Sequence, residues 1–247
     1  MVLLVSIENP SIPKKSVTLA VVSECVDKVE NIELIKVGKN KNIFSPISNH
    51  PDVNLCYAGN NTVFVACEQT QLVSTLKNKG FNVIQIDEEL HTEYPCDSLL
   101  NVAVFGNTAI LNKNTASKKL QNYLCNNNFN IIEVKQGYSK CSVLPIAENA
   151  VITTDEIICK KLSESNIDCL KVSPNGIKLD GYDYGFIGGC GGMISENELY
   201  FFGDITTHID YLRIADFLKK HNIFYKCECG SLKDLGSFIP LKEKVKV

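Results

Sequence analysis

The stretch LCYAGNNTVFVAC at residues 55–67 sets the pattern of this chain, because similar stretches return three more times. They are PCDSLLNVAVFGNTAILN at 95–112, KCSVLPIAENAVITTD at 140–155 and GCGGMISENELYFFGD at 189–204. Each reads as an apolar strand, a polar turn and a second apolar strand, with turn residues that hairpins favour. The cysteines at corresponding places, Cys56, Cys96, Cys141 and Cys190, recur about every 40 to 50 residues, which suits a repeat of four elements.

A helix and a third strand are expected after each hairpin. In the last unit Tyr211, Ile214, Ala215 and Leu218 follow the i, i+3, i+4, i+7 spacing of one apolar helix face. Asp155 is expected to cap the helix before residues 158 and 162, and Gly80 to end the helix around 72–76. The third strands are predicted at 82–86, 131–134, 169–172 and 224–227.

The two ends of the chain together supply a fifth unit. Residues 17–22 and 34–37 read as strands and 25–31 as a short helix, but this unit lacks one strand. The segment GSFIPL at 236–241 can provide it, which would close the structure on itself and remove exposed sheet edges. The prediction is an α/β fold, a five-bladed propeller of strand–strand–helix–strand units with pseudo-fivefold symmetry, forming one domain over 1–247. The alternative is two unrelated α/β layers.

Composition narrows the classes of function. The net charge is −3 and the only arginine is Arg213, so a nucleic-acid partner is not expected. No apolar run is long enough for a membrane span. The 11 cysteines, with no secretory signal, predict reduced thiols in the cytoplasm. Cys227 and Cys229 make a weak zinc motif, and neither a metal nor another cofactor is expected.

Five motifs carry a resemblance to a known fold family. They are YPCDSLLN (94–101), KQGYSKCSV (135–143), DYGFIGGCGG (183–192), GDITTHIDY (203–211) and LGSFIPL (235–241). With them the chain resembles a bacterial family of unknown activity within the pentein fold, the fold of guanidino-group-modifying enzymes. The resemblance implies the five-bladed propeller, and chemistry on C–N bonds by a Cys nucleophile, a His acid/base and carboxylates that hold a guanidinium.

The usual catalytic pair of that fold is missing at its usual positions. Asp97 matches a guanidinium-binding carboxylate near the start of its hairpin. The usual His would fall within 188–192, where only glycines and Cys190 occur, and the usual Cys near Ile239 or Pro240. The resemblance therefore leaves open whether the chain is an enzyme.

Other residues could rebuild a site. Cys141 is the candidate nucleophile, and Lys140 beside it could lower the pKa of the thiol. The candidate acid/base is His50, held extended by Pro51, or His208. Both histidines have a structural alternative, in a surface loop and at the start of a helix. The candidate ligand-binding residues are Asp97, Asp52, Asn101, Tyr138, Lys140 and Asp204.

Two functions from different classes remain open at this point. The first is a small polar or cationic metabolite bound in a central channel, with Cys141-dependent chemistry on an amidino group. The second is a non-catalytic binding or interaction module on the same scaffold. The irregular stretch 174–188 is either a lid that brings Tyr182 and Tyr184 to the ligand or a surface excursion.

Overall fold

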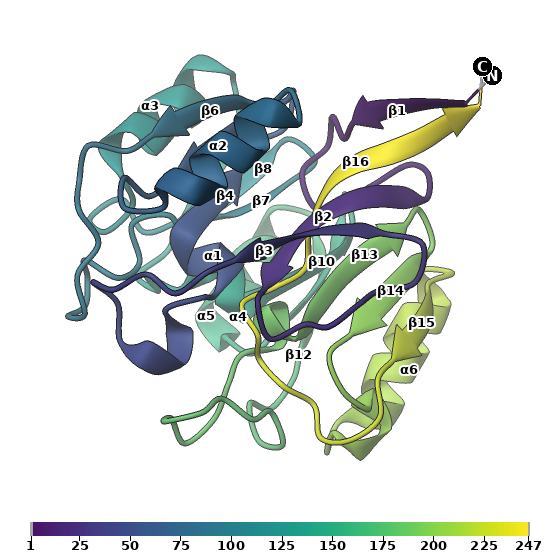
Figure 1. Ribbon diagram of the computed structural model, residues 1–247. Coiled ribbons are helices and arrows are strands. Elements are labelled where there is room, and N and C mark those ends of the chain that lie inside the picture. Colours follow the sequence, from purple (N-terminus) through teal and green to yellow (C-terminus); the bar gives the residue numbers. More distant parts are fainter. Residues whose placement is uncertain (1, 247) are drawn as a thin grey trace.

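The first hairpin forms because two asparagines accept the left-handed backbone that a tight turn needs. Asn60 and Asn61 have φ of +46° and +65°. They join β4 (Leu55–Tyr57) to β5 (Thr62–Val65) in the structure, a computed structural model that describes residues 2–246 (Figure 1). The helix α2 (Thr70–Asn78) follows, and Gly80, at φ +89°, reverses the chain into β6 (Asn82–Gln85), which runs parallel to β5. The helix end predicted at Gly80 is confirmed, and β6 covers all but the last residue of the strand predicted at 82–86.

The same order of elements recurs in three further sheets. In each, the first two strands are antiparallel and the third is parallel to the second. Asp155 accepts a hydrogen bond from the backbone N–H of Ile158, so the predicted helix cap is confirmed. The elements are β7 (Ala103–Phe105), β8 (Thr108–Leu111), α3 (Lys118–Asn126), β9 (Asn130–Glu133), α4 (Ser139–Ser142), β10 (Val143–Ala147), β11 (Ala150–Thr153), α5 (Glu156–Glu164), β12 (Asp168–Lys171), β13 (Gly191–Ser195), β14 (Glu198–Phe201), η3 (Ile205–Thr207), α6 (Tyr211–Lys220) and β15 (Phe224–Cys227).

The two ends of the chain meet in the fifth sheet. Its order is β1 (Val2–Ser6), β16 (Ile239–Lys246), β2 (Val17–Ser23) and β3 (Glu33–Val37). The C-terminal strand therefore pairs with the N-terminal unit, as predicted, and Figure 1 shows both termini at the tip of the β1–β16 ribbon. Strand β1 was not anticipated from the sequence.

The helix predicted at 25–31 is wrong. These residues form turns and a single bridge between Val29 and Ile32, and Asn31 takes a left-handed φ of +61°. A helix this short gains too few hydrogen bonds to offset the cost of its first turn. Buried Val26 and Val29 hold the segment against the core instead.

Short helical segments precede the first strand of several sheets, and they bring functional residues toward the middle of the molecule. They are η1 (Ser45–Ile47), α1 (Pro51–Asn54), α4 and η2 (Ile187–Cys190). The carbonyls of Asn54, Ser142 and Cys190 each accept a hydrogen bond from the residue that follows the second strand of their sheet. Cys141 is thus one residue out of register with Cys190, and the regular cysteine spacing was only approximate. Figure 1 shows α1 and α4 near the centre of the view.

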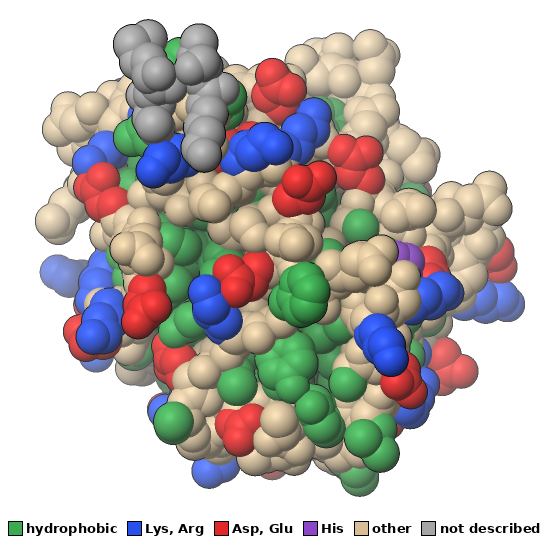
Figure 2. Space-filling model, turned by 90° about the vertical axis from the view of Figure 1, so that its right-hand side faces the viewer, with side chains coloured by type: hydrophobic (Ala, Val, Ile, Leu, Met, Phe, Trp, Pro, Cys, Tyr) green, Lys and Arg blue, Asp and Glu red, His purple; other side chains and the backbone are tan. Residues whose placement is uncertain are grey.

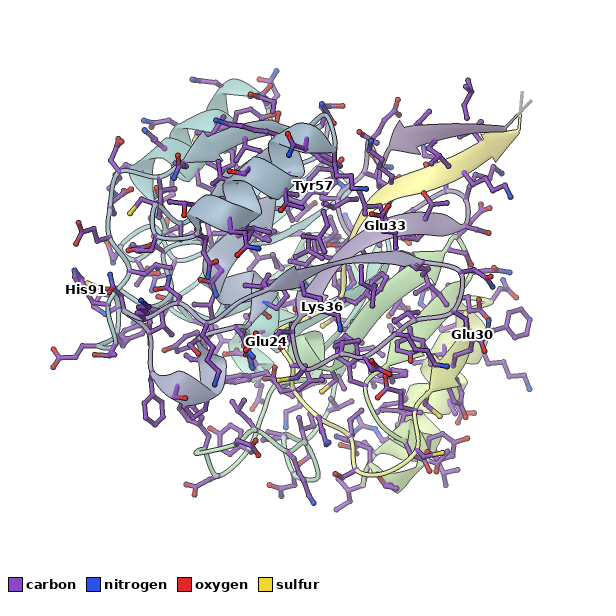
Figure 3. All side chains as sticks on the ribbon, viewed as in Figure 1. Glu24, Glu30, Glu33, Lys36, Tyr57 and His91 are labelled. Carbon is purple, nitrogen blue, oxygen red and sulfur yellow. The ribbon has the colours of Figure 1, made fainter. Side chains whose placement is uncertain are left out.

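Apolar side chains fill the sheets and their contacts, and few charged side chains are buried, among them Asp52, Asp97, Lys140 and Asp234. Phe238, Ile239 and Leu241 join the same buried cluster as Val21 and Val22 of β2. On the face seen in Figure 2, acidic and basic side chains are interspersed. Figure 3 shows His91, an exposed residue, at the edge of the molecule, away from the centre. In the part of the chain that is described, no helix combines the length and apolarity that a membrane crossing requires.

The contribution of β16 to stability can be tested by shortening one buried side chain on this strand. Leu241, on β16, is fully buried in the same cluster as Val21 and Val22 of β2. Leu241→Ala should therefore lower the free energy of unfolding by about 2–5 kcal/mol. Urea denaturation measures this. Lys244→Ala, on the same strand but exposed, is the control and should change stability by less than about 0.5 kcal/mol. Equal effects of the two variants would mean that the packing of β16 against the N-terminal unit does not stabilise the fold.

Candidate functional site

A cavity of about 290 Å³ lies where α1, α4, the loop before η2 and the segment before β16 come together. Three of the candidate residues, Cys141, His50 and Tyr138, line it, together with Asp234. The other lining residues are mostly apolar or aromatic: Ile47, Val53, Leu179, Tyr182, Asp183, Tyr184 and Phe186. Concave, largely apolar sites with a few convergent polar groups are the usual form of small-molecule sites.

Asn101 fixes the position of Cys141. Its side-chain N–H donates to the Cys141 sulfur at 2.9 Å, while its oxygen accepts from the backbone N–H groups of Lys140 (2.8 Å) and Cys141 (3.1 Å). The amide thereby clamps the first turn of α4 and holds the thiol in place. Asn101 was predicted to bind ligand; it does not line the cavity and instead positions Cys141.

The expectation that Lys140 activates the thiol is wrong. Burial, with the nearby carboxylates of Asp52 and Asp234, raises the pKa of Cys141 well above its ordinary value. Lys140 is itself buried, which lowers the pKa of its amine and weakens any effect it could have on the thiol. Its Nζ donates to Ser237 Oγ at 3.1 Å. The resting site holds a protonated thiol.

His50 is a buried histidine held by close packing. Its backbone is extended (φ −72°, ψ 124°), as the following proline predicts. Its Nδ1 lies 3.8 Å from Asp234 Oδ1, and burial lowers the pKa of the ring, which favours neutral imidazole. Gly236 (φ +77°) packs directly on it, since a Cβ there would lie 2.3 Å from the His50 Cβ.

Three carboxylates surround this region, and each is buried. Asp234 accepts from the backbone N–H groups of Phe186 (2.9 Å) and Gly236 (3.1 Å), and burial raises its pKa to about 6. Asp52 Oδ2 accepts from Ser237 Oγ at 2.7 Å, and Asp97 Oδ2 accepts from the Tyr138 hydroxyl. Burial also raises the pKa of Asp52 and of Asp97.

One oxygen of Asp52 and one of Asp97 have no hydrogen-bond partner among the described residues, although both atoms are buried. An unpaired buried acceptor costs free energy that a donor from a ligand can recover. Asp52 lies beside the Cys141 thiol. Asp97 reaches the cavity through Tyr138, which lines it.

Two predicted site residues lie elsewhere. His208 faces the Ser173 carbonyl with Nε2 (3.0 Å) and accepts from the Asp210 N–H with Nδ1 (3.0 Å), so it shapes the start of α6. Asp204 caps η3 by accepting from the Thr206 N–H at 2.9 Å. Neither lines the cavity. The alternative considered for His208, a place at the start of a helix, agrees with its hydrogen bonds, and Asp204 is a local cap.

Asp234 and Ser237 were not anticipated from the sequence. Both precede β16, as Lys140 and Cys141 precede β10, so the repeat offset was the signal that could have found them. Tyr182 and Tyr184 do reach the cavity from the loop, where they are 44% and 46% exposed. The lid interpretation of this loop therefore agrees better with the geometry than a surface excursion.

Comparison with known proteins agrees with the architecture. Residues 22–239 match the model of a family of unknown function, DUF6873. The chain belongs to this family. No curated protein matches the chain.

Several solved structures resemble this chain in fold. An amidinotransferase from the saxitoxin biosynthetic pathway of Microseira wollei is 11% identical, with a TM-score of 0.55 over 90% of this chain and 91% of that chain. The inosamine-phosphate amidinotransferase of Streptomyces griseus is 10% identical (TM-score 0.56; 91% and 92%). The agmatine deiminase of C. jejuni is 12% identical (TM-score 0.53; 92% and 90%). At such identities the likeness shows the pentein fold alone, which the sequence motifs had suggested.

The buried carboxyl of Asp234 predicts a pH dependence of stability. Its pKa is higher in the folded chain than in the unfolded chain, so the folded state binds more protons, and stability is lost as the pH rises from about 4 to 6. In Asp234→Asn this loss is absent. Relative to wild type, the variant should therefore gain about 3 kcal/mol between pH 4 and pH 7.

The measurement is urea denaturation of both proteins across this pH range, comparing the slope and not the absolute stability. Asp180→Asn, in the exposed part of the same region, controls for a change of surface charge. A difference between Asp234→Asn and wild type that stays constant with pH would contradict the prediction.

Proposed function

We propose that this protein binds a small guanidinium or amidinium cation in the cavity and acts on its amidino carbon through Cys141. The observation that carries the proposal is the meeting of a clamped cysteine, a neutral histidine and the buried carboxylate of Asp234 at one cavity, with the buried carboxylate of Asp52 beside the cysteine. We also propose that the five sheets are blades of a closed propeller and that this space is one mouth of its central channel.

The charge of the site supports a cation as ligand. Asp52 and Asp97 each have a buried oxygen without a partner, and a guanidinium brings several N–H donors and one positive charge. The aromatic rings of Tyr138 and Phe186 add surfaces on which a planar cation can stack. A bound cation would favour the ionised form of these carboxylates, which burial alone disfavours.

The cation would also activate the nucleophile. The thiol pKa is raised by burial and by neighbouring negative charge, and a bound cation offsets the second cause. The thiol proton then passes to neutral His50. The sulfur forms a bond to the amidino carbon, and one C–N bond breaks as the leaving amine takes the proton back from His50. A water, or an acceptor amine, then displaces the cysteine from the amidino group and restores the thiol.

A second candidate function is a binding module without catalysis. The raised pKa of Cys141, and the lack of the Cys/His pair at the positions usual for penteins, favour it. In that case the same carboxylates and aromatic rings would hold the cation, and Cys141 would be a packed small side chain.

Replacement of the thiol separates the two candidates. Cys141→Ser should bind methylguanidine within about threefold of wild type, while product release from methylguanidine, assayed as methylamine, ammonia and urea, falls at least about a hundredfold. Titration calorimetry and product assays measure these quantities. The exposed Cys125→Ser is the matched control and should match wild type. If wild type binds the cation but releases no product, the non-catalytic module is the correct function.

The state of the thiol can be measured directly. Alkylation of Cys141 by iodoacetamide, followed by peptide mass spectrometry from pH 6 to 10, should be slow through pH 9, because the thiol pKa is raised. Asp52→Asn removes a neighbouring negative charge, so its alkylation profile should shift to lower pH. Exposed Cys125 provides the internal control for reagent reactivity. An identical Cys141 profile in wild type and variant would show that Asp52 does not act on the thiol.

A further inference from the structure

The mouth of the cavity carries negative charge and aromatic rings. Its outer residues come from the loop that ends in η2: Tyr182, Asp183 and Tyr184, all exposed, followed by half-buried Phe186. Among the described residues that line the cavity there is no Lys and no Arg. The acidic residues that line the cavity are Asp183 at the rim and Asp234 within.

Arg213 and Lys140 both have partners outside the cavity. Arg213, on α6, pairs with Asp210 at 2.8 Å and donates to the Lys171 carbonyl at 3.0 Å. Lys140 is buried, donates to Ser237, and lines a separate crevice of about 10 Å³ with Cys56 and Ile239. A negatively charged group on a ligand would therefore find no cationic partner along the cavity.

The aromatic side chains of the mouth form a connected wall. Tyr138 and Phe186 stack with ring centroids 6.4 Å apart, and Tyr184 meets the edge of Phe186 at 6.0 Å. Tyr94 packs on Tyr138 at 5.9 Å. Such a wall offers apolar contact to a hydrocarbon stem and a favourable electrostatic face to a positive charge.

We propose that the ligand is an alkyl- or arylguanidine, or the corresponding amidine, that carries no carboxylate, and that Asp183 favours ligands with a second positive charge at the far end. This deepens, and rests on, the function proposed above. A guanidino amino acid such as arginine would bring its carboxylate against Asp183 and the aromatic wall. There it would be repelled and partly stripped of water without a partner. A stem that ends in hydrogen or in an ammonium group meets neither obstacle.

Three ligands test this class, each with a guanidino group on a stem of about four carbons: n-butylguanidine, 4-aminobutylguanidine and arginine. Titration calorimetry on the full chain at pH 7.5 should give dissociation constants for the first two that are at least about tenfold lower than for arginine. Asp183→Asn should reduce the advantage of 4-aminobutylguanidine over n-butylguanidine by about two- to fivefold, a modest change because Asp183 is exposed and screened. Asp180→Asn, exposed in the same loop but outside the cavity lining, should leave this ratio as in wild type.

The outcomes separate the two proposals. Arginine binding as tightly as n-butylguanidine overturns the proposed ligand class and leaves the proposed guanidinium site standing. Equal ratios in Asp183→Asn and wild type overturn the role of Asp183. If none of the three ligands binds, the guanidinium site itself is wrong, and the ligand class falls with it.

Discussion

The passage of the chain from residue 234 to 238 is the constraint on which the site depends. The backbone N–H groups of Leu235 and Ser237 both donate to the Gly189 carbonyl, and the Gly236 carbonyl accepts from the Asp52 N–H. These bonds join the last segment of the chain to α1 and η2 before β16 enters the sheet with β2. If the closing strand were displaced, Asp234 and Ser237 would leave His50, Asp52 and Lys140 at the same time.

Close backbone approach makes this junction possible. A Cβ at Gly189 would lie 1.8 Å from Asp234 Oδ1, and a Cβ at Gly236 would overlap His50. Small residues here let a buried carboxylate and an imidazole occupy the space that side chains would otherwise fill. The glycine-rich segment 188–192 thus leaves room for a carboxylate from another part of the chain.

The electrostatics of the resting site follow from burial. Asp52, Asp97 and Asp234 have raised pKa values, His50 and Lys140 have lowered ones, and Cys141 is kept protonated. Desolvation is the largest cause for each, and it disfavours the charged form of every one of these groups. Of these groups, His50, Cys141 and Asp234 line one cavity, and perturbed groups gathered in a cavity are typical of functional sites. The ligand that completes such a site is one that supplies the missing charge.

The sequence by itself determined the local units. Apolar runs, the turn asparagines and the spacing of helix faces indicated four repeated units and placed their third strands to within about a residue, because these signals act over a few neighbouring residues. It also identified Asp52, Asp97, His50 and Cys141 as candidates. The helix at 25–31 failed because propensity over so short a stretch yields to packing. The tertiary structure alone decided that Asp234 and Ser237 join Cys141, that His208 and Asp204 stay outside, and that Lys140 does not activate the thiol. Those outcomes depend on contacts between residues far apart in the chain, and on a burial that raises or lowers each pKa, neither of which is encoded in local pattern.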